Sequence, residues 1–235
     1  MESKNHSTVA YHNGRCEVEH TNIVAEQPVT RTINTEKWLT FMCMPIDLEA
    51  LAVGFLYNEN IKQKKDDIAN LRVCPGGNNN DVWLNNPARK PDKWTRTSGC
   101  SGAETSIAEN SFTTGLTNPQ NAIIFPPQLI GNQMKQLLKS QDLYKKSGGM
   151  HTSSMCGGDR INLIVEDIGR NNTLDKFAGK LLLSHIKPSD SIILTTGRII
   201  SEMIQKAGRI GTSFVISQTS PTSLSIQMSE KLGIT

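Results

Sequence analysis

Residues 161–183 read "INLIVEDIGRNNTLDKFAGKLLL", in which a β-branched run leads directly into a helical pattern. The run "INLIV" is typical of a buried strand. The apolar residues after it recur at the spacing of one helix face, namely Leu174, Phe177, Ala178, Leu181 and Leu182. Two further runs, "SIILT" (191–195) and "SFVIS" (213–217), are followed by similar patterns, which comprise Met203, Ile204 and Ala207, then Leu224, Met228 and Leu232. Three alternations of strand and helix predict an α/β domain with a parallel sheet and right-handed crossovers.

The chain upstream shows a different pattern. Its first forty residues alternate polar and β-branched types, as in "NIVAEQPVTRTIN", which predicts two or three strands. The stretch "DLEALAVGFLYNE" (47–59) predicts a helix with Asp47 as its N-cap, and "FPP" (125–127) opens another helical pattern. Residues 74–97 are rich in Asn, Gly, Pro and Lys, with a short "DVWL" that fits one strand. We therefore predict a domain boundary within residues 74–97.

Composition restricts the class of partner. The 235 residues include 25 basic and 22 acidic side chains, and this balance favours no polyanion, so we expect no nucleic-acid partner. The polar N-terminus lacks a signal-peptide core, and no run approaches the roughly 20 apolar residues of a membrane span, so we expect a cytoplasmic protein. The cysteines stand at positions 16, 43, 74, 100 and 156 without a CxxC pair, which predicts reduced thiols.

Ligands of open α/β sheets bind beyond the carboxyl ends of the strands. Three loops should meet there: "EDIGRNN", "TTGR" and "QTSPTS". Guanidiniums, hydroxyls and helix N-termini together favour an anion such as phosphate. The candidate binding residues are Arg170, Thr196, Gly197, Arg198, Ser220, Thr222 and Ser223. The alternative is that the hydroxyls, including Thr195, are helix caps and that the arginines are solvated or pair with Glu166 and Asp167. Both interpretations stay open, because no GxGxxG or GxxxxGK[ST] phosphate loop occurs.

Two further loops carry candidate residues. In "SGGMHTSSM", His151 follows paired glycines that would let a ligand approach closely, although an ordinary surface histidine would look the same. In "RTSGCSGAE", Gly99 and Gly102 leave the Cys100 thiol accessible. Its neighbour Arg96 would favour the thiolate and Glu104 would oppose it. Cys100 is therefore either a reactive thiol or a small residue in a turn.

Six segments together resemble one family, the FdhD/NarQ-type accessory sulfurtransferases of formate dehydrogenase. They are "MPIDLEALAVGFLYNENI", "RTSGCSG", "SGGMHTSSM", "EDIGRNNTLDKFAG", "TTGRIISEMIQKAG" and "SPTSLSIQMSEKLGIT". These motifs follow the order and spacing of the family over residues 32–235. The resemblance implies a smaller N-terminal α+β domain, here residues 1–93, and a cytidine-deaminase-like α/β domain, here residues 94–235, commonly in a homodimer.

The resemblance also implies an activity. A cysteine desulfurase would load sulfur onto Cys100 as a persulfide, and the sulfur would pass to the molybdenum of bis-molybdopterin guanine dinucleotide before that cofactor enters apo-formate dehydrogenase. His151 and the loop residues named above would hold the phosphates of the cofactor, and a guanine nucleotide could occupy the same site. Zinc is not expected, because the H-x-E and P-C-x-x-C signatures of zinc deaminases do not occur.

The sequence departs from the family in three places. Ala103 stands where a second loop cysteine often occurs, so an internal disulfide cannot resolve Cys100. Asn171 replaces the histidine of the family's "EDVGRHN" motif, so no proton transfer is assigned there. The chain also ends at Thr235, before a glycine- and basic-rich strand of the family. The missing second cysteine keeps open an alternative function, a non-catalytic chaperone that delivers the cofactor to apo-formate dehydrogenase.

Overall fold

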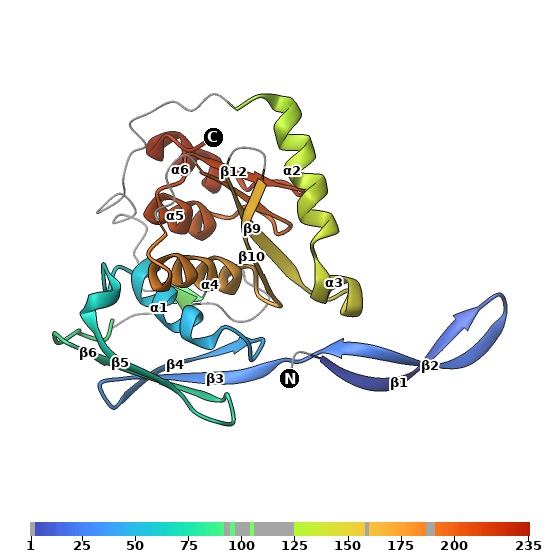
Figure 1. Ribbon diagram of the computed structural model, residues 1–235, viewed down its shortest axis with the longest axis horizontal. Coiled ribbons are helices and arrows are strands. Elements are labelled where there is room, and N and C mark those ends of the chain that lie inside the picture. The colour runs from blue at the N-terminus through green and yellow to red at the C-terminus, as the bar shows by residue number, and fades with distance from the viewer. Residues whose placement is uncertain (1–2, 92–94, 97–103, 106–124, 158–159, 187–190) are drawn as a thin grey trace.

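A computed structural model describes residues 3–91, 95–96, 104–105, 125–157, 160–186 and 191–235. Figure 1 shows two four-stranded sheets with helices between and around them, and one long hairpin that projects away from the rest. The hairpin consists of β1 (Ser3–His12) and β2 (Arg15–Val24), which pair antiparallel along their full length. Its turn is Asn13-Gly14 with positive φ at both residues, as the tight turns favoured in hairpins require.

The N-terminal sheet is mixed, with strand order β4-β3-β6-β5. Its strands are β3 (Gln27–Ile33), β4 (Glu36–Cys43), β5 (Ile68–Val73) and β6 (Asn79–Leu84). Helix α1 (Leu48–Asn58) packs on one face of this sheet, and a short 3-10 turn η1 (Lys65–Asp67) leads into β5. The predicted "DVWL" strand lies within β6, and the predicted helix is α1. Residues 3–43 form four strands rather than the predicted two or three.

Asp47 occupies the N-cap position of α1, but it does not cap through its side chain. Its backbone is left-handed, and its carboxylate instead pairs with Lys180 at 2.7 Å. Arg31 is a second departure from simple patterning, because it is fully buried on the core face of β3, with its guanidinium carbon 4.7 Å and 5.1 Å from the ring centres of Phe41 and Phe55. This burial lowers the pKa of Arg31 to about 10, against the opposing charge of Asp175.

The C-terminal sheet is also mixed, which corrects the prediction of a parallel sheet. Its order is β10-β9-β11-β12, with β9 (His151–Gly157), β10 (Arg160–Asp167), β11 (Ser191–Thr195) and β12 (Phe214–Ser217). The three predicted strands β10, β11 and β12 do run in one direction. However, β9 lies between β10 and β11 and is antiparallel to both. The stretch "SGGMHTSSM", predicted as a loop, includes the first five residues of β9, and its residues Thr152, Ser153 and Ser154 are buried.

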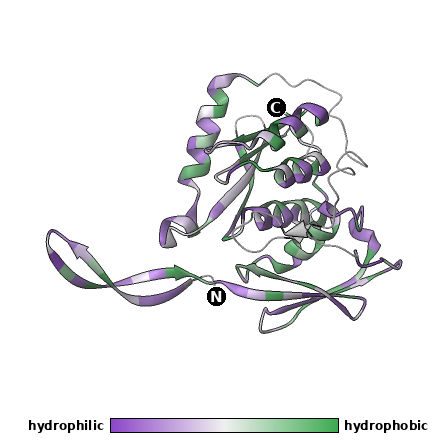
Figure 2. Ribbon diagram, turned by 180° about the vertical axis from the view of Figure 1, so that it is seen from behind, coloured by the Kyte–Doolittle hydropathy of each residue, from purple (hydrophilic) through white to green (hydrophobic). Residues whose placement is uncertain are grey.

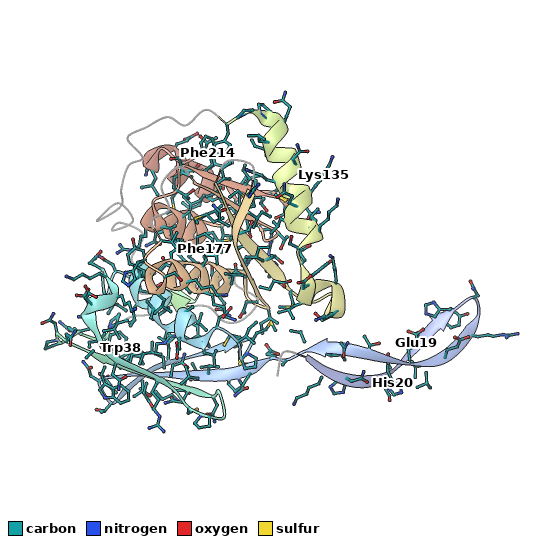
Figure 3. All side chains as sticks on the ribbon, viewed as in Figure 1. Glu19, His20, Trp38, Lys135, Phe177 and Phe214 are labelled. Atoms are coloured by element: carbon teal, nitrogen blue, oxygen red, sulfur yellow. The ribbon has the colours of Figure 1, made fainter. Side chains whose placement is uncertain are left out.

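Helices cover both faces of the C-terminal sheet. They are α2 (Pro127–Lys139), α3 (Asp142–Ser147), α4 (Arg170–Leu183), α5 (Ser201–Ile210) and α6 (Ser223–Leu232). Core residues of α4, α5 and α6 pack on one face, where Phe177 lies in Figure 3. Residues of α2 pack with Phe214 on the other face. Figure 2 shows hydrophobic and hydrophilic residues alternating along α2, and the predicted helix after "FPP" is confirmed. Leu224 of α6 is 42% exposed, so its predicted place on the buried face is wrong.

The N- and C-terminal parts meet where α1 crosses α4. A Cβ on Gly54 would lie 1.7 Å from the carbonyl oxygen of Asp175, and one on Gly179 would lie 1.9 Å from that of Ala50. Only glycine permits this approach of the two helix backbones. The predicted domain boundary between residues 93 and 94 falls outside the described residues and stays a prediction. Between residues 91 and 125 the structure describes only β7 (Thr95–Arg96) and β8 (Glu104–Thr105), which pair antiparallel.

Candidate functional site

The carboxyl ends of β10, β11 and β12 lie at the same edge of the C-terminal sheet, because these strands run in one direction. Since β9 is antiparallel to them, its first residue also lies at this edge. His151 pairs in register with Asp167 at the end of β10, and Ser153 pairs with Thr195 at the end of β11. The strand that sequence analysis missed therefore brings the "SGGMH" loop to the predicted anion edge.

His151, Arg170 and Gly197 form the centre of this edge. A Cβ on Gly197 would lie 3.0 Å from Cβ of Arg170 and 3.5 Å from Nδ1 of His151. The absence of a side chain at position 197 therefore lets the three residues approach closely. Burial lowers the pKa of His151, the charges of Arg170 and Arg198 lower it further, and Asp167 partly opposes them. The imidazole is thus kept neutral near neutral pH, so one ring nitrogen can donate and the other can accept.

The two arginines differ in exposure. Arg170 is the first residue of α4 and is only 2% exposed, whereas Arg198 is exposed in the loop before α5. The first turn of α4 contains no acidic residue, so the guanidinium adds to the positive end of the helix dipole. A buried cation at a helix N-terminus with a second cation nearby favours an anionic ligand.

The adjacent acidic residues Glu166 and Asp167 point to opposite sides of the strand end, as predicted, and are not an acid/base couple. The Glu166 carboxylate accepts hydrogen bonds of 3.0 Å from the backbone N–H groups of Leu143 and Tyr144, and so holds the first turn of α3. Asp167 is fully buried and pairs with Lys176 at 2.6 Å. Both carboxylates therefore have structural roles, a distinction that spacing alone does not reveal.

Buried hydroxyl groups hold the loop after β11. The Thr195 hydroxyl accepts hydrogen bonds of 3.2 Å from the backbone N–H of Gly197 and from the Ser153 hydroxyl. Thr196 exchanges two 3.0 Å bonds with the backbone of Thr152, one through its hydroxyl and one through its N–H. Thr195 is thus an internal support of the loop rather than a helix cap. Ser217, which sequence reasoning missed, donates a 2.7 Å hydrogen bond to the Gly197 carbonyl.

The loop before α6 is hydrogen-bonded to the segment that follows Arg198. Thr222 does cap α6, as the alternative interpretation proposed, because its hydroxyl accepts from the Ser225 N–H at 3.3 Å. The Thr222 N–H donates to the Ile199 carbonyl at 3.0 Å, just after Arg198. Ser220, Thr222 and Ser223 are exposed. The structure therefore brings His151, Arg170, Gly197 and Arg198 together. The loop that contains Ser220 and Thr222 lies beside them.

Asn171 has a partner outside this cluster. Its side-chain amide donates to the Glu202 carboxylate at 2.5 Å, which links the first turns of α4 and α5. The position that carries histidine in the family therefore has a structural contact here. No motif could have indicated this pairing, since 31 residues separate the two.

Cys100 and Ala103 lie outside the described residues. The flanking strands β7 and β8 place Arg96 opposite Glu104 in an antiparallel pair, so the two ends of the segment that carries Cys100 are held together. Among the described residues, no group of three His, Cys, Asp or Glu side chains is arranged to hold a metal ion. No helix in the described part of the chain is long and apolar enough to span a membrane.

Comparison with known proteins places these features in a family. The model of the FdhD/NarQ family matches residues 24–235. The chain belongs to the FdhD/NarQ family. It is 32% identical over 228 residues to the sulfur carrier protein FdhD of Bacillus licheniformis, covering 95% of this chain and 86% of the relative. It is 29% identical to the sulfur carrier protein FdhD of Staphylococcus aureus (strain MRSA252) over 231 residues, which cover 97% and 87% of the two chains.

A solved structure shares the fold. The crystal structure of a formate dehydrogenase accessory protein from Desulfotalea psychrophila matches with a TM-score of 0.80 and 26% sequence identity. The match covers all of this chain and 91% of the other. The mixed α/β architecture is therefore shared with a solved structure.

Proposed function

We propose that this FdhD/NarQ-family protein is a cytoplasmic sulfurtransferase that carries sulfur for the maturation of formate dehydrogenase. The observation that carries the proposal is the meeting of His151, Arg170, Gly197 and Arg198 at one sheet edge, in a chain similar over its length to sulfur carrier proteins. A cysteine desulfurase would be the donor, bis-molybdopterin guanine dinucleotide the acceptor, and apo-formate dehydrogenase the recipient. The proposal includes a cytidine-deaminase-like fold for residues 94–235 and a homodimer.

The sulfur step falls to Cys100 in this proposal. Its thiolate attacks the outer sulfur of the persulfide on the desulfurase, so that a new S–S bond forms and the desulfurase cysteine leaves as a thiolate. In the second step the outer sulfur passes to the molybdenum of the bound acceptor. The S–S bond breaks, Cys100 leaves as a thiolate, and the reduced molybdenum supplies the electron pair. Because Ala103 offers no resolving thiol, Cys100 must deliver its sulfur directly to this acceptor.

The candidate edge would hold the phosphates of the acceptor. Fork-shaped guanidiniums of Arg170 and Arg198 suit phosphate oxygens, and the neutral His151 imidazole can donate one further hydrogen bond. The polar groups of the two adjoining loops would complete the set, from Thr196, Gly197, Ser220, Thr222 and Ser223. A guanine nucleotide alone could occupy part of the same site.

Persulfide transfer provides the test. The protein is incubated with a cysteine desulfurase and cysteine, and intact-mass spectrometry then measures the gain of one sulfur atom. We expect this gain in the wild type and in Cys16→Ala, which removes an exposed thiol of the hairpin, but not in Cys100→Ala. An undiminished gain in Cys100→Ala would exclude Cys100 as the carrier. If Cys100→Ala also restored formate dehydrogenase activity in a strain lacking this protein, the chaperone alternative would replace the sulfurtransferase.

A further inference from the structure

The projecting hairpin β1–β2 has two chemically different faces. Side chains of a strand alternate between its faces, and residues opposite one another in an antiparallel pair share a face. Val9 is paired with Val18, and Tyr11 with Cys16, so these four side chains lie on one face. The other face carries Thr8, Ala10 and His12 opposite Glu19, Glu17 and Arg15. A contact of 3.2 Å between His12 and Glu19 lies on this charged face.

The apolar face has no cover within the chain. No residue from 4 to 23 is buried, and Figure 3 shows Glu19 and His20 on the part that projects from the body. Among the described residues, the three most exposed large hydrophobic side chains are Val9, Tyr11 and Val18, at 71%, 72% and 72%. A two-stranded hairpin alone in water is marginally stable at best. The apolar face therefore calls for a covering surface from another molecule.

We infer that this covering surface is the same hairpin face of a second copy of the chain. The inference rests on the homodimer included in the proposed function, and it assigns the surface that forms it. A two-fold interface brings identical residues near one another, so like charges on the contact face would oppose it. From residue 4 to residue 24 this face carries no Lys, Arg, Asp or Glu, whereas Glu17, Glu19 and Arg15 all lie on the opposite face.

The rest of the described surface offers no better match. Away from the hairpin, the described chain has four large exposed hydrophobic residues. Leu224 and Ile226 lie in α6, whereas Tyr144 and Ile186 lie on separate segments. None forms a strip that would match a hairpin face in length. Two identical hairpins can pack face to face like the two layers of a sandwich, about 10 Å apart. One face of the two ten-residue strands supplies about half of their side chains, so the hairpins would form a small interface whose strength depends on the paired Val9, Tyr11 and Val18.

The position of the hairpin relates this interface to the candidate site. A Cβ on Gly149 would lie 3.7 Å from Cγ1 of Val24, so the base of the hairpin touches the loop that leads into His151. None of the candidate site residues lies on the hairpin, so its apolar face is left to assembly rather than to sulfur transfer.

Sedimentation velocity of the full chain at low to high micromolar concentration tests the inference. The variants are Tyr11→Lys and Val18→Lys on the apolar face, with Ala10→Lys on the charged face of the same hairpin as the control. We expect a dimer for the wild type and for Ala10→Lys. Each apolar-face variant should raise the dimer dissociation constant at least about tenfold, since it would bury an unpaired charge. Circular dichroism should match the wild type, because the body of the protein does not contact these side chains, whereas the melting temperature should fall only as far as loss of the dimer requires.

The outcomes distinguish the homodimer of the proposed function from the hairpin interface inferred for it. A wild-type chain that is monomeric at every concentration overturns the homodimer and the hairpin interface together. A wild-type dimer that persists in both apolar-face variants overturns only the hairpin interface, and so does a dimer that Ala10→Lys weakens equally. Neither result bears on persulfide formation at Cys100, which is measured separately by mass.

Discussion

Replacing Asp167 with asparagine should destabilise the protein strongly, although the two side chains have nearly the same shape. One carboxylate oxygen accepts 2.8 Å hydrogen bonds from the Gly169 N–H and the Asn172 side chain. The other accepts from the Met44 N–H at 3.2 Å and pairs with the Lys176 ammonium at 2.6 Å. All four partners are donors, so whichever way the new amide turns, its NH₂ group faces two donors.

The magnitude follows from burial. The side chains of Asp167 and Lys176 are both 0% exposed, so the substitution leaves an ammonium group in the interior without its counter-charge. Removing one partner of a buried pair lowers the free energy of unfolding by about 3–5 kcal/mol. Lys176 keeps only a 3.4 Å contact with the Met44 carbonyl, which is too long to replace the pair.

Urea denaturation of four proteins measures the effect: the wild type, Asp167→Asn, Lys176→Met, and the double variant. We expect the double variant to be clearly more stable than the sum of the two single losses predicts, because it removes both buried charges. A loss below about 1 kcal/mol in Asp167→Asn would refute the reasoning, and so would additive losses in the cycle.

Four further predictions concern the site and the core. Arg198→Ala should weaken binding of a guanine dinucleotide about tenfold by calorimetry, whereas Arg72→Ala on exposed β5 should not; equal affinities would remove Arg198 from the site. Gly197→Ala should lower that affinity with little change in melting temperature, because its Cβ would lie 3.0 Å from Cβ of Arg170 and shift that residue; unchanged binding would contradict the crowding argument. The folded pKa of His151 is lowered, so the folded state binds fewer protons than the unfolded state, and the free energy of unfolding should fall as the pH drops from about 6.5 through the folded pKa. His151→Gln should remove that part of the pH dependence, and identical pH curves would disprove it. Arg31→Met should leave stability unchanged or raise it by up to about 4 kcal/mol in urea denaturation, because the guanidinium is desolvated; a large loss would show that its contacts with the two rings outweigh desolvation.

Local patterns predicted the elements whose burial follows simple periodicity. Leu174, Phe177, Ala178 and Leu181 are all buried on α4, as their spacing indicated. The parallel direction of β10, β11 and β12 also followed from strand–helix alternation. Leu224 was wrong because the buried face of α6 consists of Ser225, Met228 and Leu232, so that Ser225 rather than Leu224 takes the buried position in the first turn.

The central strand β9 was out of reach of the same reasoning. The buried hydroxyls of Thr152 and Ser153 look polar in sequence, but both are paired with side chains of other segments. The Ser153 hydroxyl lies 2.7 Å from that of Thr173, and Thr152 accepts from the Gln141 side chain at 2.9 Å. A buried polar strand is stable only when such partners exist, and single-sequence periodicity carries no information about them. For the same reason the sequence could not predict that His151 lies beside Arg170 and Gly197, although all three were named as candidate binding residues.

The N-terminal part of the protein belongs to the site even though none of its residues was proposed to bind the ligand. Asp167 ends β10 just before the loop that carries Arg170, and its second oxygen is held by the backbone of Met44. Asn172, in the first turn of α4, donates to the Met42 carbonyl as well as to Asp167. The chain after β4 therefore fixes the start of α4, and with it the guanidinium of Arg170. Because Gly54 and Gly179 lock α1 against α4 at backbone distance, a displacement of the N-terminal sheet must be transmitted to the anion edge rather than absorbed between the two parts.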